Sequence, residues 1–368
     1  FFLHARLVDG KRVIAEDTLT YGVVNPRRTD PRDYQKCRFL GFSSGGGFQN
    51  TESPHPEQSL RDKMGVSVVH DWDYHGWRTA QPNAGDPIKP AVRSAFPKVV
   101  YCPNLEQMRG RKPGHPWGDI STMAPSWATF DDPFRPGCKT FDIDGYVAYI
   151  VAYVRTNREA VLSVVPSGLE RTMDARTLEL QRKAYTALKR EFPDLPVGMM
   201  IYGLTDPRGV DLVLKEKLYE VADFFDDHMY VSAIDWTQVN RLHAELQKLG
   251  LQRPLLSTEF SRVGGTDQLQ RARDTITSML DAHAHGMYQV NYYNMYLGNP
   301  GEPPLRDPIL RGSFPGDGFA WMQYVDRPRV SAAISSTSWG RGSYGGDERG
   351  ASLMPMLQCL AFYNFVQA

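Results

Sequence analysis

Residues 254–265 read PLLSTEFSRVGG, an apolar run that ends on a carboxylate and leads into a glycine-rich segment. The apolar run has the composition of a buried strand. Burying a charged group without a partner costs on the order of several kcal/mol. Glu259, at the end of this run, is therefore expected to have either a structural partner or a chemical task.

Similar apolar runs recur along the chain, and longer segments with helical periodicity lie between them. The eight candidate strands are residues 38–43, 66–72, 98–103, 160–165, 197–203, 222–230, 254–259 and 287–293. The candidate helices are residues 59–65, 144–155, 175–192, 209–221, 237–250, 267–286 and 352–368. Eight strands, each followed by a helix, predict the α/β class and a (β/α)8 TIM barrel, which usually takes roughly 250 residues plus insertions.

The chain is expected to form a single catalytic domain over residues 1–368. Residues 1–35 are predicted as an N-terminal extension, because Asp9-Gly10 between two apolar runs is a hairpin signal. We expect this hairpin to cover the barrel floor. Residues 297–350, rich in Gly, Pro, Trp and Ser, are too long for a plain connection between the eighth strand and the last helix. They are predicted to be a loop insertion over one face of the barrel.

The charge balance favours a neutral partner. Lys and Arg together number 42, as do Asp and Glu, so the formal net charge is zero. Binding to nucleic acid or to an anionic membrane surface would favour an excess of basic residues. No apolar run approaches the roughly 20 residues that a membrane span needs, so no membrane span is expected.

The sequence leaves the cellular compartment open, with a secreted or periplasmic location favoured over a cytoplasmic one. The first residues are too quickly charged for a signal peptide, so the chain is compatible with a mature form. The cysteines lie far apart, without a C-x-x-C pair, and predict no zinc site. They are Cys37, Cys102, Cys138 and Cys359.

Polar and aromatic residues gather where the candidate strands end. In strand order they are His70, Asp71 and Trp72; Asn104 and Glu106; Ser167 and Glu170; Tyr202 and Asp206; His228 and Tyr230; Glu259; and Asn291, Tyr292 and Asn294. In a (β/α)8 barrel these ends form the catalytic face. Aromatic rings that stack on sugar, with carboxylates and amides for its hydroxyls, suit an oligo- or polysaccharide. Trp321 and Trp339, in the insertion, are further candidates for a sugar subsite.

Five segments carry a resemblance to a known group. They read MGVSVVHDWDYHGWRTAQPNAGD (64–86), APSWA (124–128), LQRKAYTALKREFPDLPVG (180–198), ADFFDDHMY (222–230) and RPLLSTEFSR (253–262). In this order they resemble segments of clan A glycoside hydrolases. The similarity is greatest to the family 39 group of β-xylosidases, α-L-iduronidases and exopolysaccharide hydrolases.

The resemblance implies a retaining O-glycoside hydrolase that works by double displacement with two Glu residues and without a metal or organic cofactor. Glu259 matches the nucleophile position, and Glu170, after the fourth strand, matches the acid/base; Glu106 is the reserve candidate for the acid. Two positions depart from the pattern. Leu169 stands where the clan usually has Asn, and His70 stands where it usually has Arg.

Alternatives remain for each assignment. Glu259 could be a structural carboxylate paired with an Arg, and Glu170 could simply open a helix, where acids are favoured by the helix dipole. His228, with Tyr230, fits a hydrogen-bonding pair near the nucleophile, yet a core histidine is a comparable interpretation. The rim aromatics could serve the core. His283 and His285 lie in the tail of a helix without a metal-binding signature.

Two other functions use the same residues. One is a catalytically weakened barrel that binds polysaccharide without cleaving it, which the departures at Leu169 and His70 favour. The other is a transglycosylase. The sugar, its linkage, exo or endo action and the oligomeric state are not indicated by the sequence.

Overall fold

The structure is a computed structural model of the 368-residue chain. It describes residues 2–20, 40–44, 68–71, 98–103, 129–131, 139–167, 175–201, 203–230, 234–261, 268–292, 322–325 and 352–355.

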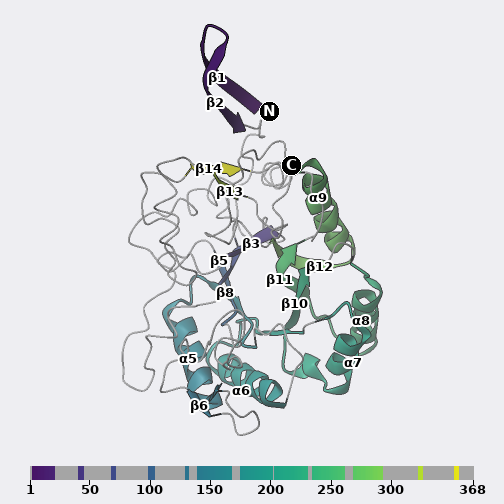
Figure 1. The fold of residues 1–368 in the computed structure, drawn as a ribbon. Helices are drawn as coiled ribbons and strands as arrows, with labels where there is room; N and C mark the ends of the chain where they lie inside the picture. The colour runs from purple at the N-terminus through teal and green to yellow at the C-terminus, as the bar shows by residue number, and fades with distance from the viewer. Residues whose placement is uncertain are drawn as a thin grey trace.

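A parallel sheet of eight strands is the centre of the fold (Figure 1). Its strands are β3 (Leu40–Ser44), β4 (Val68–Asp71), β5 (Lys98–Tyr101), β8 (Val161–Val164), β9 (Gly198–Met200), β10 (Phe224–Tyr230), β11 (Leu255–Ser261) and β12 (Met287–Tyr292). Each strand falls within, or within one or two residues of, one of the eight predicted runs. The α/β class and the number of strands in the sheet were thus predicted from the sequence.

The strand order is cyclic. It runs β8-β5-β4-β3-β12-β11-β10-β9, so that the first strand of the sheet along the chain pairs with the last. The two ends of this order meet at a single parallel bridge between Val164 and Val197, where the Val164 N–H donates to the Pro196 carbonyl at 3.1 Å. Hydrogen-bonded ladders join the other neighbours, so the seam between β8 and β9 is the sparsest pairing of the sheet.

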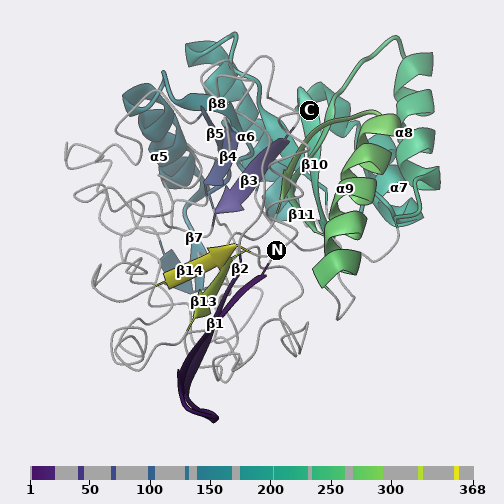
Figure 2. The same cartoon turned by 90° about the horizontal axis from the view of Figure 1, so that it is seen from above.

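Helices cover one face of this sheet (Figures 1 and 2). They are α5 (Ile143–Thr156), α6 (Ala175–Glu191), α7 (Pro207–Lys215), α8 (Thr237–Lys248) and α9 (Gln268–Ala284), with a 3-10 turn η3 (Leu218–Glu220) after α7. The helix predicted over 209–221 therefore ends early, and Lys217 between α7 and η3 has a left-handed backbone, with φ of 52°. The other helices from α5 to α9 agree with their predicted ranges to within two residues.

The apolar residues of the sheet divide into two clusters. The larger cluster joins strand residues to helix residues; within it the ring of Tyr101 stacks on that of Tyr153 from α5, with centroids 3.8 Å apart. The smaller cluster consists of residues from the strands and from the positions just after them. Its buried members are Val68, Val100, Cys102, Val165, Met200, Phe224 and Leu256. This cluster lies on the face of the sheet opposite the helices, and it is called the inner cluster below.

Two antiparallel hairpins flank the parallel sheet in the sequence. β1 (Phe2–Asp9) pairs with β2 (Arg12–Thr20), as the Asp9-Gly10 turn predicts, and β6 (Thr129–Asp131) pairs with β7 (Lys139–Phe141). Figures 1 and 2 show the β1–β2 hairpin projecting away from the sheet rather than lying across it. The lid that was expected to cover the barrel floor is therefore not formed by these residues.

The helix predicted over residues 352–368 is wrong at its beginning. Residues Ser352–Pro355 form strand β14, which pairs antiparallel with β13 (Met322–Val325). Pro355 explains the difference, because a proline disfavours the helical conformation of the residue before it and cannot donate a helical hydrogen bond. β13 lies within the predicted insertion 297–350, so two residue ranges that were expected to differ in structure share one small sheet.

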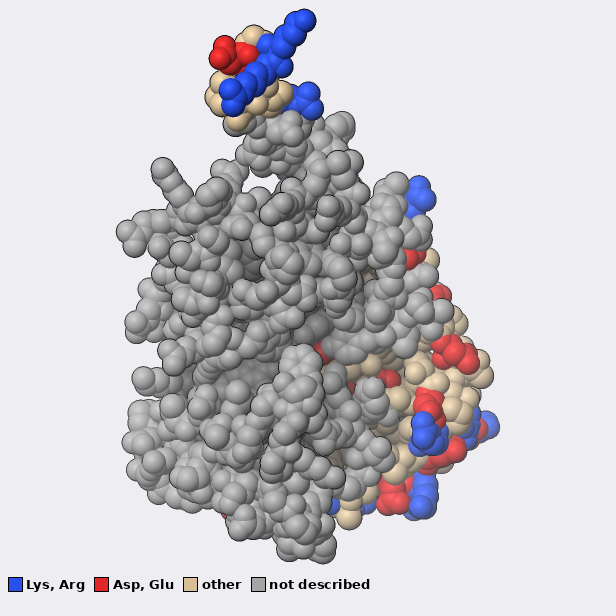
Figure 3. All heavy atoms as spheres, in the orientation of Figure 1, with Lys and Arg blue, Asp and Glu red and all other residues tan. Residues whose placement is uncertain are grey.

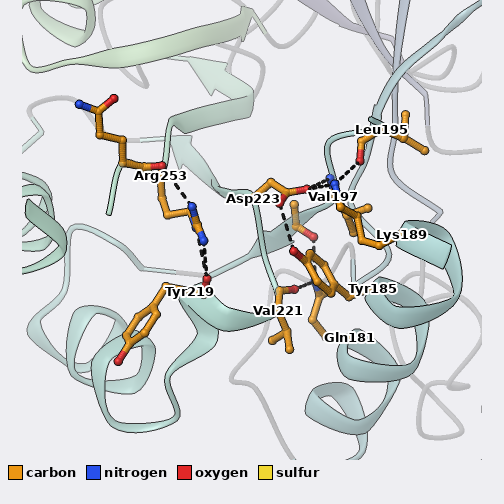
Figure 4. Close-up of polar contacts among 11 residues, drawn as sticks. Gln181, Tyr185, Lys189, Leu195, Val197, Tyr219, Val221, Asp223 and Arg253 are labelled. Carbon is orange, nitrogen blue, oxygen red and sulfur yellow. Dashed lines mark hydrogen bonds and ion pairs between the residues drawn. The ribbon is translucent and has the colours of Figure 1, made fainter. Parts of the chain in front are cut away.

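Polar side chains tie α6 to the amino ends of β9 and β10 (Figure 4). The Asp223 carboxylate accepts hydrogen bonds from the Val197 N–H at 2.9 Å, the Tyr185 hydroxyl at 3.2 Å and the Lys189 ammonium at 3.0 Å. Gln181 donates to the carbonyls of Gly198 and Val221, at 3.0 and 2.8 Å. This group of contacts, called the amino-end network below, satisfies backbone groups that strands leave unpaired where they begin.

The charged residues of the described surface are mixed in sign. On the face shown in Figure 3, the Lys and Arg side chains of the described residues alternate with Asp and Glu, and neither sign forms a large patch. Among the described residues, none of the helices has the length and apolar character that crossing a bilayer requires.

Candidate functional site

Glu259 is positioned by a β-bulge in β11. Against β10, Asp226 pairs with Leu256 and His228 with Glu259, so two steps on β10 face three steps on β11. Against β12, Ser257 pairs with Val290 and Phe260 with Tyr292, again two steps against three. The pairing with β10 thus places one extra residue of β11 between Leu256 and Glu259, and the pairing with β12 places it between Ser257 and Phe260. Such bulges change the direction in which a strand presents its side chains.

The bulge decides the face on which Glu259 lies. Side chains alternate along a regular strand, so a residue three positions after Leu256, a member of the inner cluster, would point toward the helices. With the extra residue, Glu259 instead lies on the same face as Leu256. There it is 4% exposed and contacts His70, which follows inner-cluster residue Val68 by two positions on β4.

Contact between Glu259 and His70 also requires a strongly curved sheet. Two strands, β12 and β3, separate β11 from β4. In a flat sheet, β11 and β4 would be about 14 Å apart at roughly 4.8 Å per strand. The His70 Nδ1 and Glu259 Oε1 atoms are nevertheless 3.7 Å apart. The inner face is therefore concave, and residues from well-separated strands meet across it.

Three of the predicted site residues converge at this point. The Nδ1 atom of His228 lies 3.4 Å from Glu259 Oε2, and the rings of His70 and His228 are 6.0 Å apart between centroids. Burial lowers the pKa of His70 well below its ordinary value, and the neighbouring His228 lowers it further. His70 is thus a neutral imidazole at neutral pH, and the two histidines flank Glu259 on the inner face, one from β4 and one from β10.

A chain of hydrogen bonds supports His228 from behind. Its Nε2 atom lies 3.2 Å from the Thr258 hydroxyl oxygen, and this hydroxyl donates to Asp226 Oδ2 at 2.6 Å. Because the Thr258 proton is used toward Asp226, the Thr258 oxygen accepts from His228 Nε2–H. In the neutral ring this leaves Nδ1, the nitrogen that faces Glu259, with a lone pair.

Asp226 also holds the bulge itself. Its Oδ1 atom accepts a hydrogen bond from the Thr258 N–H at 2.8 Å, so the carboxylate takes two bonds from one bulge residue. Backbone groups at a bulge lose their regular ladder partners, and Asp226 replaces one of them. Burial raises the pKa of Asp226, since an ionised carboxylate is disfavoured in an apolar surrounding.

The next residue, Asp227, binds the turn that follows β9. Its carboxylate accepts from the N–H groups of Gly203 and Leu204, at 3.0 and 2.7 Å. Burial raises the pKa of Asp227 to about 7, although these two hydrogen bonds oppose the shift. The carbonyl of Asp227 in turn accepts from the Ser257 hydroxyl at 2.7 Å. Asp226 and Asp227 therefore connect the bulge to the neighbouring strand ends.

β12 adds two buried amides to the same sheet. Gln289 Nε2 donates to Asn291 Oδ1 at 2.7 Å, and both residues are buried. Among the described residues, none is a hydrogen-bond partner of the Asn291 Nδ2 group. Asn291 was among the rim residues expected from the sequence, whereas Gln289 was not.

Most of the remaining predicted residues divide into three groups. Tyr230 and Tyr292 end strands β10 and β12, and only their backbones are described. Outside the described residues lie Glu170, Trp72, Asn104, Glu106, Asn294, Trp321 and Trp339. His285 belongs to a surface contact, in which its ring stacks on Trp236 at 4.9 Å between centroids and its Nε2 atom lies 3.7 Å from Asp281.

Sequence reasoning missed Asp226, Asp227 and Thr258. The signal available was the pair of adjacent carboxylates in FFDDH, inside a run otherwise typical of a buried strand. Two charges in such a run would have raised the same question that Glu259 raises. Thr258 gave no signal of its own, because threonine is common in strands.

The site has the donor atoms of a metal-binding group. One ligand atom from each of His70, His228 and Glu259 lies within 4.8 Å of the other two. No metal ligand was expected from the sequence. The same three residues can also serve acid–base or nucleophilic chemistry, because they combine a buried carboxylate with imidazoles.

Comparison with known proteins identifies the fold. No protein-family model matches the chain, and no curated protein matches it. The crystal structure of SrfJ from Salmonella typhimurium aligns with 100% of this chain and 84% of its own, at 13% identity and a TM-score of 0.54.

Structures of glycoside hydrolases are also among the similar ones. The intracellular xylanase TsXylA from Thermoanaerobacterium saccharolyticum JW/SL-YS485 is 14% identical over 72% of this chain and 88% of its own, with a TM-score of 0.46. β-Glucuronidase 2 from Bacteroides uniformis is 11% identical over 80% of this chain and 36% of its own, with a TM-score of 0.41. At these identities the similarity concerns the fold alone, and the chain shares its α/β fold with SrfJ.

Proposed function

We propose that this protein is a retaining O-glycoside hydrolase of clan A type, built on a (β/α)8 barrel that spans residues 1–368. The observation that carries the proposal is the placement of Glu259. This carboxylate is buried at the carboxyl-terminal part of a parallel strand, turned by a bulge onto the concave face, and flanked by two imidazoles. The cyclic strand order and the resemblance of five sequence segments to clan A enzymes support the barrel and its chemistry.

In the proposed mechanism Glu259 attacks the anomeric carbon and forms a covalent glycosyl-enzyme. Glu170 protonates the departing oxygen and then activates the water that releases the sugar. Such a pair works with carboxyl groups roughly 5 Å apart. Because burial keeps His70 neutral, it lies beside Glu259 without the strong charge stabilisation that a fixed cation would give. That leaves the carboxylate a better nucleophile.

We assign substrate contacts to the residues at the strand ends. His70 and His228 lie beside the nucleophile. The other proposed contacts are Trp72, Asn104, Glu106, Tyr230, Tyr292, Asn294, Trp321 and Trp339. The substrate class is an oligo- or polysaccharide, and residues 297–350 are proposed to lie over the site.

A non-hydrolytic barrel that binds polysaccharide is the second candidate. The observation that favours it is His70, a neutral imidazole beside Glu259 at the position where clan A enzymes usually have Arg. Leu169, in place of the usual Asn, points the same way. A transglycosylase would use the same carboxylates and differ only in the acceptor.

Turnover by wild type and two variants tests the nucleophile. Aryl glycosides and polysaccharides are screened with wild type, and the mass and anomeric configuration of the products are measured. Glu259→Gln should abolish turnover, because no covalent intermediate forms without that oxygen. Glu245→Gln, at an exposed position on α8 that pairs with Lys248, is the matched control and should retain wild-type turnover.

The acid/base is tested with an activated substrate. Glu170→Gln should still be glycosylated by an aryl glycoside with a good leaving group and then stall, and azide should restore turnover with a glycosyl azide of retained configuration. If Glu170→Gln keeps full activity and Glu106→Gln loses it, the acid belongs to the third strand. If wild type cleaves none of the substrates but binds polysaccharide, the non-hydrolytic barrel is the correct function.

A further inference from the structure

His70, His228 and Glu259 supply the donor set of a known class of metal site. Two imidazoles and one carboxylate hold catalytic zinc in several metalloenzymes and leave a fourth position open. Here the three residues come from three different strands, β4, β10 and β11, and their ligand atoms are mutually within 4.8 Å. The three residues lie far apart in the sequence, so the fold brings them together. His228 and Glu259 are paired directly between β10 and β11.

The distances agree with tetrahedral coordination. With zinc–ligand bonds of about 2.0–2.2 Å, neighbouring ligand atoms lie roughly 3.4 Å apart. The His228 Nδ1 atom lies 3.4 Å from Glu259 Oε2, the His70 Nδ1 atom lies 3.7 Å from Glu259 Oε1, and one ligand atom from each residue lies within 4.8 Å of the other two.

The surroundings of His228 resemble the outer shell of a metal site. A metal-bound histidine usually donates its second ring N–H to an oxygen, which fixes the tautomer and the ring orientation. His228 has such a partner in Thr258, which is itself held by Asp226. In the neutral ring the lone pair of Nδ1 then faces the Glu259 carboxylate at 3.4 Å. Two electron-rich atoms at that separation favour a cation between them.

We propose that His70, His228 and Glu259 bind one divalent cation of the zinc class. Imidazole nitrogens with a single carboxylate favour Zn²⁺ and Cu²⁺ over Mg²⁺ and Ca²⁺, which prefer oxygen-only sites. Coordination would occupy the Glu259 oxygens and block attack on a sugar. Zinc is thus a reversible inhibitor of the hydrolase, and this consequence rests on the proposed function, whereas the binding itself does not.

Zinc binding to the metal-free full chain tests the site. Isothermal titration with Zn²⁺ should give one site per chain, and binding of Mg²⁺ at the same concentrations should be absent. His70→Gln, His228→Gln and Glu259→Gln should each weaken zinc binding at least about tenfold, and Thr258→Val should weaken it about 10- to 100-fold by releasing the second ring nitrogen. His283→Gln, at an exposed histidine on α9, is the control and should bind zinc like wild type.

A spectroscopic arm excludes loss of folding as the explanation. Cobalt(II) substituted into wild type should give the visible absorption of a low-coordinate site, and Thr258→Val with an unchanged circular dichroism spectrum should shift it. Zinc bound equally well by all three ligand variants, or not bound by wild type, would overturn the proposal. If zinc binds as expected but no glycoside is cleaved, the metal site stands and the hydrolase assignment fails. If glycosides are cleaved and zinc neither binds nor inhibits, only the metal site fails.

Discussion

The acidic side chains at the two ends of the same sheet have different surroundings. At the amino ends of β9 and β10, Asp223 is held by an ammonium, a hydroxyl and a backbone N–H, and the side chains of Asp223 and Lys189 remain 28% and 27% exposed. Toward the carboxyl ends, Glu259 lies against two imidazoles, and the side chains of Glu259 and His70 are only 5% and 1% exposed. Asp226 and Asp227 are buried beside them.

If the proposed function is correct, this difference separates a stabilising network from a catalytic one. A partly exposed carboxylate with a lysine partner keeps its charge at little cost. Buried carboxylates beside neutral groups raise the free energy of the charged form, which shifts pKa values and favours reactivity. Substitutions at the amino end should therefore change stability alone, whereas those at the carboxyl end should change the pH dependence and the activity.

The largest expected effect is on the pH dependence of stability. Because the pKa of Asp227 is raised to about 7, its contribution to stability is fully present below the unfolded-state value near 3.8 and is lost as the pH rises through 7. Asp227→Asn, which resembles the protonated acid, should remove this decline, a change on the order of a few kcal/mol between pH 4 and pH 8. Urea unfolding at a series of pH values measures it.

Asp211→Asn, at an exposed position on α7, is the control for that series and should leave the pH profile unchanged. The comparison of the two ends would be contradicted if Asp227→Asn and wild type lost stability in parallel between pH 4 and pH 8. His70 contributes with the opposite sign. Its lowered pKa gives stability that is present above about pH 6.5 and is lost as the pH falls.

The second prediction concerns the support of the bulge. Asp226→Asn removes one acceptor from the Thr258 hydroxyl and N–H pair, so the bulge and His228 lose their fixed positions. A displacement of about 1 Å of a catalytic group costs on the order of 100-fold in rate. We expect kcat/KM to fall by about that factor while KM changes little, measured on any glycoside that wild type cleaves.

Asp223→Asn at the amino-end network is the matched substitution. It should leave kcat/KM within about twofold of wild type. Equal losses of activity in the two variants would show that both act only through folding, and the division between the two ends would fail.

A smaller effect is expected at Gly198, the first residue of β9. A Cβ atom there would lie 2.1 Å from the Phe224 ring, so Gly198→Ala forces the ring to move within the inner cluster. Overpacking of this kind costs about 1–3 kcal/mol, measured as a decrease in the free energy of unfolding. Phe224→Leu in the same chain should recover part of the loss, and a purely additive double variant would contradict the contact.

The smallest effects belong to the amino-end network. Asp223→Ala leaves the Val197 N–H and the Tyr185 hydroxyl without their acceptor, which should cost about 1–2 kcal/mol. Lys189→Met removes a partly exposed ion pair, a bond to the Leu195 carbonyl and the approach of the ammonium to the Tyr185 ring, and should cost less than about 1 kcal/mol. Thermal unfolding ranks the two variants; a larger loss for Lys189→Met would mean that the ion pair dominates.

Much of the fold was predictable from the sequence, because it depends on local patterns. Each strand of the sheet is an apolar run long enough to be buried on both faces, and each described helix from α5 to α9 has an apolar stripe. The proximity of His70, His228 and Glu259 was also predictable, since the carboxyl ends of parallel strands lie at the same edge of a sheet.

The geometry around Glu259 was not predictable, because it depends on register. The run LLSTEFS contains no Gly or Pro that would mark a bulge, and alternation alone does not show which residue is the extra one. The bonds between Asp226 and Thr258 join positions 32 residues apart and exist only once β10 and β11 are aligned. Strand β14 depends on a partner in another segment of the chain, which composition does not reveal.

The extra residue in β11 distinguishes two properties of the site: the direction of the Glu259 side chain, and the contacts of Thr258 with Asp226 and His228. With Ser257 deleted, the strand would run regularly from Leu256 to Glu259, and Glu259 would still face inward, because the two residues would then be two positions apart. Thr258 would instead point toward the helices, away from Asp226 and His228. A strand one residue shorter could therefore present the same acid in the same direction. The longer strand additionally places the Thr258 hydroxyl on the inner side. Deletion of Ser257, rather than a substitution, would therefore separate the direction of Glu259 from the contacts of Thr258.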